Sequence, residues 1–354
     1  EGCKMGVVPA DGYIRIPETL RPRNAINCAR YICNQKEHNK FYYNFSALRH
    51  CPAFGMLTIL NAIRSNIKKY PSSEHIPVRI DEGDGGSYAA YMGFFNSIEL
   101  TDWNIGRAIE HFEADERVIP ITKINREDLQ KQYSEKTYVL GEMIELASEE
   151  LALTLTQNDS SPVNDTLRFC IREIIRNTFE HSKSDAVWVC GQYWPTKNST
   201  EIAIMDEGQG ILNSLRLNRH YDVSSDIDAN KLALQPGVSR MFGIRQDPDD
   251  PWQNSGYGLF MSSSLCTIGG HFIISSGADT TFVDSQHQQH YQSSTQGTII
   301  CLSLKTDNVD NLSNVLKKLS RKGEEISRSY GKNRILTASK VSSIASIVSH
   351  IEND

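Results

Sequence analysis

The stretch Arg172-Glu-Ile-Ile-Arg-Asn-Thr-Phe-Glu-His-Ser182 decides how the second half of the chain is interpreted. It predicts a helix that places Glu173 and Asn177 four residues apart. Because residues i and i+4 share one helical face, the carboxylate and the carboxamide point into the same space. A carboxylate can orient or deprotonate a water molecule, and an amide oxygen can hold Mg²⁺. A solvated polar face is the alternative, so the interpretation depends on the residues that follow.

An aspartate followed by two glycines closes the next segment. Ala186–Cys190 and Glu201–Met205 predict an antiparallel hairpin, and Asp206-Glu-Gly-Gln-Gly-Ile211 follows directly. Glycines let the backbone approach a flat ligand, and the carboxylate can accept a hydrogen bond from an amine. An acidic turn is the alternative. The mostly polar segment 211–254 favours a lid, because loops of such length are uncommon without a function.

A second glycine pair stands where the chain enters another helix. Asn254-Ser-Gly-Tyr-Gly-Leu-Phe260 leads into an apolar helix predicted over Leu259–Cys266. Glycines at a helix start leave N–H groups exposed, and such groups bind phosphates. Strands predicted at His271–Ser275 and Gly297–Leu304 complete an α/β sandwich.

In this order the motifs resemble the N, G1, G2 and terminal glycine-threonine motifs of the GHKL ATPase superfamily, over roughly residues 135–305. The resemblance implies a GHKL (Bergerat) fold that binds ATP and Mg²⁺. It implies that Glu173 is the catalytic general base, that Asn177 ligates Mg²⁺ between the phosphates, and that Asp206 binds the adenine amine. The other nucleotide-binding residues that it implies are Gly208, Gly210, Ile211, Gly256, Gly258, Leu259 and Thr298.

Several residues near these motifs are assigned plainer roles. The Glu180-His181 ending is closer to the anti-sigma-factor serine kinases than to histidine kinases. We expect His181 to cap its helix. Arg240 and Arg245 are expected to be surface charges of the lid rather than contacts of a γ-phosphate. The segment from His287 to His290 is expected to be a flexible hairpin tip rather than a metal site.

Strand and helix patterns alternate in the first half of the chain, which predicts an α/β layer structure. The predicted strands are Tyr13–Ile16, Lys40–Phe45 and Ile76–Ile80. The predicted helices are Pro22–Cys33, Ala53–Lys69 and Tyr88–Phe95. The glycine-rich segment around Gly83 lacks the lysine of a phosphate-binding loop, so we expect a strand-to-helix turn there.

Three short motifs of this half, Asn44-Phe-Ser46, Pro52-Ala-Phe-Gly55 and Tyr91-Met-Gly-Phe-Phe95, resemble STAS-like modules found ahead of nucleotide-binding domains. The resemblance covers roughly residues 38–105. Phosphorylatable STAS proteins carry a serine at the place that Phe54 occupies here. Phenylalanine has no nucleophilic oxygen, so we expect no phosphorylation at that position.

We therefore expect an α/β protein in three parts. These are a STAS-like domain at residues 1–125, a GHKL ATP-binding domain at 126–305 and a C-terminal helical extension at 306–354. Two apolar stripes of the extension are expected to dock on the chain's own domain. They consist of Leu312, Val315, Leu316 and Leu319, and of Val341, Ile344, Val348 and Ile351.

Composition excludes several classes of function. The chain has 37 Lys and Arg against 43 Asp and Glu, with no strongly basic tract, so we expect no nucleic-acid partner. Its eight cysteines form no CxxC pair and several lie in apolar runs, which favours a reducing, cytoplasmic compartment. No apolar run approaches the roughly 20 residues of a membrane span, and no signal-peptide pattern opens the sequence.

The leading expectation is an ATP-binding, Mg²⁺-dependent GHKL-type ATPase that acts as a nucleotide-controlled regulatory switch, with serine/threonine protein kinase activity as a variant. The alternative is a non-catalytic module in which a nucleotide locks a conformation that a protein partner recognises. Phe54 motivates the alternative, because it removes the obvious phosphate acceptor. Whether the chain forms a homodimer is left open.

Overall fold

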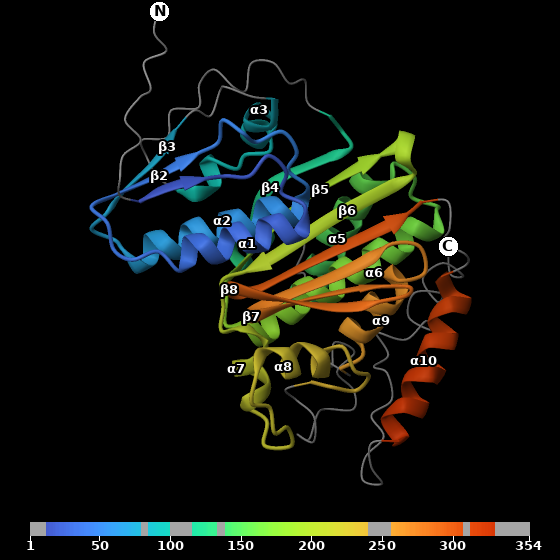
Figure 1. Ribbon diagram of the computed structural model, residues 1–354. Helices are drawn as coiled ribbons and strands as arrows, with labels where there is room; N and C mark the ends of the chain where they lie inside the picture. The colour runs from blue at the N-terminus through green and yellow to red at the C-terminus, as the bar shows by residue number, and fades with distance from the viewer. Residues whose placement is uncertain are drawn as a thin grey trace, which may run out of the picture. The chain divides into compact units, whose positions relative to one another are not determined.

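The computed structural model describes residues 12–78, 84–99, 115–132, 139–239, 256–306 and 312–329. The chain divides into two compact units, Glu1–Ala114 and Asp115–Asp354 (Figure 1). Both units are mixed α/β, the first with a parallel sheet and the second with an antiparallel one. The coarse α/β prediction is therefore confirmed.

The first unit contains a three-stranded parallel sheet in the order β1-β2-β3. Its strands are β1 (Tyr13–Arg15), β2 (Lys40–Asn44) and β3 (Glu74–Val78). Its helices are α1 (Pro22–Cys33), α2 (Ala53–Lys69) and α3 (Asp84–Tyr91), followed by a 3₁₀ turn at Asn96–Ile98. The helices predicted from Pro22 to about Cys33 and from Ala53 to about Lys69 are confirmed, because each begins at or just after a proline and carries strong apolar periodicity.

Helix α3 differs from its predicted range. It begins at Asp84, inside the glycine-rich segment that was predicted to be a turn, and it ends before Phe95. Gly93 has a φ of 75°, a left-handed conformation that terminates a helix. Phe54 is 1% exposed within α2, so it packs in the core of this unit.

The second unit is built on a five-stranded antiparallel sheet in the order β4-β5-β6-β8-β7. The strands are β4 (Val118–Asn125), β5 (Ala186–Trp194), β6 (Ser199–Asp206), β7 (His271–Asp284) and β8 (Gln288–Lys305). Strand β4 pairs with β5, so it belongs to this unit, whereas the sequence interpretation assigned residues 118–125 to the first domain. The β5–β6 hairpin is confirmed, and β7 and β8 are longer than predicted.

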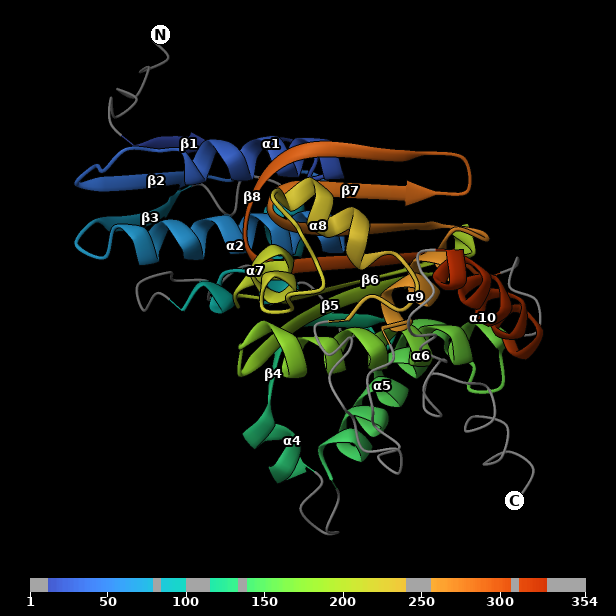
Figure 2. The same cartoon turned by 90° about the horizontal axis from the view of Figure 1, so that it is seen from below.

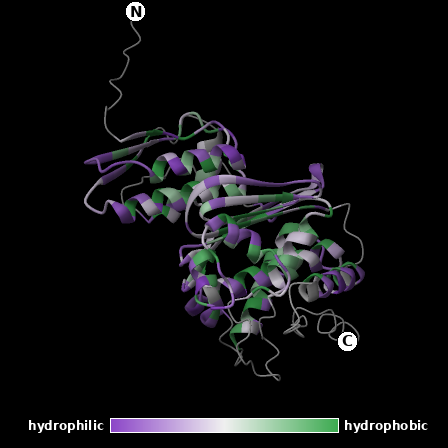
Figure 3. Cartoon of the chain, turned by 60° about the horizontal axis from the view of Figure 1, so that its bottom comes forward, coloured by the Kyte–Doolittle hydropathy of each residue, from purple (hydrophilic) through white to green (hydrophobic). Residues whose placement is uncertain are grey.

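Helices cover one face of this sheet (Figure 2). They are α4 (Arg126–Gln132), α5 (Leu140–Thr156), α6 (Pro162–Asn177), α9 (Gly258–Cys266) and α10 (Leu312–Ser329). Helix α6 starts at Pro162 and is capped by Ser161, whose hydroxyl accepts from the Asn164 N–H at 3.1 Å. These helices carry both hydrophilic and hydrophobic positions along their length (Figure 3).

Alternate residues of the strands meet these helices in a single apolar core. The strand residues include Val187, Val189, Ile202, Ile204, Ile300 and Leu302. Ile171, Ile174 and Ile175 of α6 pack in the same cluster. Leu316 of α10 is also in it, so the first apolar stripe of the C-terminal extension docks on its own unit as predicted. The second stripe lies outside the described residues.

The predicted lid contains regular structure. Helices α7 (Gly210–Arg216) and α8 (Asp226–Ala233) occupy much of the segment that was predicted as a long loop. Leu215, Val223 and Ala229 form a small core of their own there. Both helices are too short for apolar periodicity to reveal them. Arg240 and Arg245 lie outside the described residues.

Among the helices that the structure describes, none is both long and apolar enough to cross a bilayer.

Candidate functional site

One pocket of the second unit gathers most of the residues that the sequence motifs singled out. The space it outlines, including the solvent at its mouth, is about 800 Å³. The predicted residues that line it are Asn177, Asp206, Gly210, Ile211, Gly256, Gly258, Leu259 and Thr298. Four elements that are distant in sequence, α6, the end of β6, the start of α9 and β8, therefore converge here.

Sequence reasoning missed part of the pocket wall. The further lining residues are Ile174, Thr178, Ser182, Ile204, Ser214, Leu215, Ala233, Val238, Ser239 and Ile300. Helical spacing from Asn177 could have indicated Ile174, and spacing from Ile211 could have indicated Ser214 and Leu215. No sequence signal indicates Val238 and Ser239, because their position depends on how the segment after α8 folds back.

Asp206 provides the buried negative group of the pocket. It ends β6, is 4% exposed, and pairs across the sheet with Thr298 of β8. One carboxylate oxygen accepts a hydrogen bond from the Gly208 N–H at 2.8 Å. Burial raises the pKa of Asp206 to about 7, although hydrogen bonds from Gly208 and from the Thr298 hydroxyl and N–H oppose this rise. The side chain can therefore change its protonation state near neutral pH.

Gly208 allows close packing of the backbone and does not form part of the pocket surface. It is not among the lining residues, and a Cβ placed on it would collide with the Ser182 carbonyl. The adjacent Gln209 N–H donates to that same carbonyl at 2.8 Å. The glycine thus lets the turn after Asp206 lie directly on the end of the α6 segment. Ile211, which does line the pocket, donates its N–H to the Ser276 hydroxyl at 3.0 Å.

A single π-helical turn, Thr178–Ser182, follows Asn177. The sequence predicted a helix from Thr166 to His181, whereas the helix already begins at Pro162 and ends in this π-helical turn. Such turns are rare and are frequent at functional sites. Thr178 and Ser182 line the pocket, and the Ser182 hydroxyl donates to the Thr178 carbonyl at 2.8 Å. The backbone of His181 lies in this turn, and its side chain is outside the description.

Glu173 lies just behind the pocket wall. It is 3% exposed and is not a lining residue. A Cβ added to Gly258 would stand 2.5 Å from Glu173 Oε2, so only glycine at that position lets the wall lie against the carboxylate. The carboxylate is thus adjacent to the start of α9 and separated from the cavity by the glycine backbone.

Arg172 hydrogen-bonds the other oxygen of Glu173, and Arg176 lies within ion-pair distance of it. Glu173 Oε1 accepts from Arg172 at 3.1 Å (Nη2) and 3.3 Å (Nε), and Arg176 Nη1 lies 3.9 Å away. Arg172 also donates to Glu145 of α5 at 3.1 Å. The neighbouring Arg168 contacts the same glutamate at 2.8 Å. Charged contacts therefore connect α5 through Arg172 to the carboxylate beside Gly258.

The start of α9 forms the opposite wall. Gly256, Gly258 and Leu259 line the pocket there, and the N-cap residue Tyr257 makes no capping hydrogen bond through its own side chain. The first N–H groups of a helix have no partners within the helix, and the helix dipole makes this end attractive to anions. The arrangement suits an anionic group, as the glycine pair predicted.

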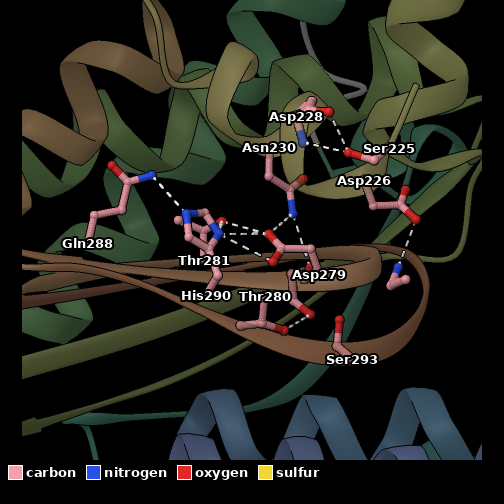
Figure 4. Close-up of polar contacts among 12 residues, drawn as sticks. Ser225, Asp226, Asp228, Asn230, Asp279, Thr280, Thr281, Gln288, His290 and Ser293 are labelled. Atoms are coloured by element: carbon pink, nitrogen blue, oxygen red, sulfur yellow. Dashed lines mark hydrogen bonds and ion pairs between the residues drawn. The ribbon is translucent and has the colours of Figure 1, made fainter. Parts of the chain in front are cut away.

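Helix α8 adds a wall residue, Ala233, and is fastened to the β7–β8 hairpin. The Asn230 amide donates to the Asp279 carboxylate at 2.9 Å and to its carbonyl at 3.0 Å. Asp226 accepts from the Ala278 N–H at 2.9 Å. Figure 4 shows Asp279 between Asn230 of α8 and His290 of β8. Asp279 is 1% exposed, so this buried carboxylate anchors the wall helix to the sheet.

The two histidines of the hairpin do not converge on one site. His290 lies 3.3 Å from Asp279, whereas His287 lies 3.6 Å from Asp284. A hairpin is confirmed, but His290 stands within β8 and is paired with Thr281, so the strand extends closer to the turn than predicted.

The buried contact between α8 and the sheet leads to a prediction about stability. Replacing Asn230 with alanine should lower the free energy of unfolding by about 1 to 3 kcal/mol. Asp279 would lose the two hydrogen bonds that it accepts from the Asn230 amide, while it stays buried. Urea denaturation measures this. The matched control is Lys231→Ala on the exposed side of α8. An equal effect of both substitutions would contradict the anchoring role.

Comparisons with protein-family models, with curated proteins and with solved structures find no match for this chain.

Proposed function

We propose that the chain is an ATP-binding, Mg²⁺-dependent ATPase of the GHKL type, which acts as a nucleotide-controlled regulatory switch. The observation that carries the proposal is the pocket itself. It brings a buried carboxylate, a carboxamide and a helix N-terminus to one cavity, from Asp206, Asn177 and the start of α9. These three groups suit the three parts of a nucleotide-magnesium complex.

Asp206 and its surroundings fit a purine base that carries an amine. The ionised carboxylate can accept a hydrogen bond from the exocyclic amine of adenine. Guanine has a carbonyl oxygen at the equivalent position, which would face another acceptor. Apolar side chains of Ile174, Ile204 and Ile300 line the same cavity and suit the faces of a flat ring. We therefore propose adenine as the preferred base.

The remaining wall fits a phosphate chain. The N–H groups at the start of α9 can bind anionic oxygens, and the glycines at 256 and 258 keep side chains out of their way. Asn177 offers an amide oxygen, a ligand type suited to Mg²⁺. When bound, Mg²⁺ would neutralise phosphate charge and orient the terminal phosphate.

Glu173 is the proposed general base. Its carboxylate lies against Gly258, and the two arginines fix its orientation. A general base must reach the proton that it removes either directly or through one water molecule. Glu173 is not a lining residue, so we propose that it acts through a water molecule held at the wall.

The pKa of Asp206 predicts how binding depends on pH. Affinity for adenosine should rise as pH increases from 5 to 8, because the ionised carboxylate accepts more strongly from the adenine amine than the protonated acid does, and the pKa of Asp206 is about 7. Adenosine is the suitable probe, since it has no phosphate that titrates in this range. Isothermal titration at several pH values measures the affinity. An Asp206→Asn variant should show no such dependence. A flat profile for the unmodified protein would contradict the role of Asp206.

A specific observation favours the alternative of a non-catalytic nucleotide-binding module. Glu173 is buried, paired with arginines and absent from the pocket surface, so it is less accessible than a base commonly is. In this alternative the nucleotide locks a conformation for a protein partner. Phe54, buried in α2 of the proposed STAS-like unit, likewise offers no phosphate acceptor.

One experiment separates these possibilities. The full chain is incubated with Mg²⁺ and ATP labelled at the γ-phosphate, and both ADP and labelled protein are followed. Steady, Mg²⁺-dependent release of phosphate supports the ATPase and excludes the non-catalytic module. Transfer of label to serine or threonine of a protein supports the kinase variant. Nucleotide binding without turnover supports the alternative, and absence of binding overturns the proposal.

A further inference from the structure

We propose that Glu201, His271 and Cys301 form a binding site for a transition-metal ion of the zinc class. One donor atom from each, an oxygen, a nitrogen and a sulfur, lies within 4.8 Å of the other two. The residues come from β6, β7 and β8, which are neighbours in the sheet (Figure 1). It is the one such grouping of three among the residues that the structure describes.

The strand register explains why these side chains meet. Glu201 and His271 both pair with Ser303 of the central strand β8, and Cys301 is two residues earlier on the same face. Neighbouring strands are about 4.8 Å apart, so the backbones at 201 and 271 are roughly 10 Å apart across β8. The glutamate and the histidine are long enough to lean inward, and the small serine between them leaves room.

The three donors match zinc chemistry. Zinc accepts thiolate, imidazole and carboxylate ligands, whereas Mg²⁺ and Ca²⁺ prefer oxygen alone. Ionised Glu201 and Cys301 would balance the charge of a divalent ion, so the loaded site would be neutral. Metal–ligand bonds of about 2.0 to 2.3 Å require the widest donor pair to close by on the order of 1 Å. Rotation of the glutamate side chain provides such a movement, and a water molecule would complete the tetrahedron.

A neighbouring ring fixes the orientation of the histidine. His271 stacks on Phe282 of the same strand, with ring centroids 5.1 Å apart and an interplanar angle of 23°. Contacts that orient a ligand are a usual feature of metal sites. The cysteine is fully buried, while the other two residues are partly exposed.

This site is separate from the nucleotide pocket. Glu201 precedes Asp206 by five positions on β6, which corresponds to about 17 Å along a strand. The pocket uses Ile204 and Ile300, and the strand alternation places Glu201 and Cys301 on the opposite face. A metal bound here is therefore distinct from any Mg²⁺ that a nucleotide brings.

The test uses the full chain after removal of metal with a chelator. Zn²⁺ is added in competition with a chromophoric indicator, and Co²⁺ is added separately because a cobalt–thiolate bond gives a charge-transfer absorption in the near ultraviolet. The variants are Cys301→Ser, His271→Asn and Glu201→Gln. Matched controls are Cys33→Ser in the first unit and His287→Gln at the hairpin turn. Circular dichroism of each metal-free variant shows whether it is folded.

We expect one Zn²⁺ per chain and a cobalt–thiolate band. Each site variant should weaken Zn²⁺ binding by more than about 100-fold, since even changes to residues behind the ligands cost 10-fold to 100-fold. Cys301→Ser should also remove the band, and both controls should leave binding unchanged. Absence of stoichiometric binding, a band that survives in Cys301→Ser, or equal losses in the controls would overturn the proposal. If a single site variant is misfolded, the other two variants decide the outcome.

Discussion

Replacing Asp206 with alanine should remove most of the rise in melting temperature that ATP gives the unmodified protein. A ligand at a hundredfold excess over Kd stabilises a protein by about 2.7 kcal/mol. Removal of a buried charged partner costs roughly 2 to 5 kcal/mol of binding, which is about 30-fold to 4,000-fold in Kd. Asp206 is 4% exposed and lines the pocket, so its loss should fall in this range. Thermal melts with and without ATP and Mg²⁺ measure the change.

The control is Asp222→Ala, which removes an exposed carboxylate of the same unit. It should leave the ATP-induced shift intact. A shift of undiminished size in Asp206→Ala would show that the base does not bind at this carboxylate. The nucleotide-free protein provides a second readout, since the pKa of Asp206 also affects folding.

The sign of that effect follows from the raised pKa. The folded pKa of about 7 exceeds the unfolded value of about 3.9, so the folded state binds more protons between these pH values. The associated stability is complete below pH 3.9 and is lost as pH rises through 7. A shift of about three units corresponds to about 4 kcal/mol at most. Asp206→Asn should therefore flatten the fall of the free energy of unfolding between pH 4 and pH 7.

Replacing Glu173 with glutamine should preserve ATP binding and lower ATP turnover by about 10²-fold to 10⁴-fold, the usual contribution of a general base. Glutamine is a better choice than alanine, because alanine would leave Arg172 and Arg176 buried without their shared partner. Breaking a buried ion pair in that way costs about 3 to 5 kcal/mol of stability. Production of ADP under saturating ATP and Mg²⁺, together with a binding isotherm, measures both effects.

Glu145→Gln is the matched control, since Glu145 contacts the same Arg172 but does not adjoin Gly258. It should lower turnover much less than Glu173→Gln. Unchanged turnover in Glu173→Gln would exclude Glu173 as the base. Equal losses in both variants would indicate that the charged network, rather than proton removal, sets the rate.

Long periodic elements could be predicted from the sequence, whereas short ones could not. Helix α2 was predicted closely because apolar side chains recur along its 17 residues and Pro52 precedes it. Helices α7 and α8 have 7 and 8 residues, so neither completes enough turns to show a pattern. The outer part of the β7–β8 hairpin was missed because glutamine and serine dominate there, and only the ladder shows that they are paired.

The motif residues of the pocket could be named from the sequence because each motif has a local physical reason. Asp206 with its glycines and the glycine pair before α9 are examples. The buried, ion-paired environment of Glu173 could not be predicted, because its partner Arg172 is oriented by Glu145, which lies on another helix. Gly208 was assigned to the base pocket, yet its constraint comes from the Ser182 carbonyl. Such long-range packing is invisible to a local pattern.

In the proposed ATPase, the charged contacts from α5 to Glu173 would make turnover adjustable from outside the pocket. Glu145 of α5 and Glu173 share the Arg172 guanidinium, so a small displacement of α5 would reorient the carboxylate beside Gly258. An effector that pushes on α5 would then change the speed of the chemical step while ATP affinity stays the same. Regulation of this kind would appear in kcat and leave Kd untouched.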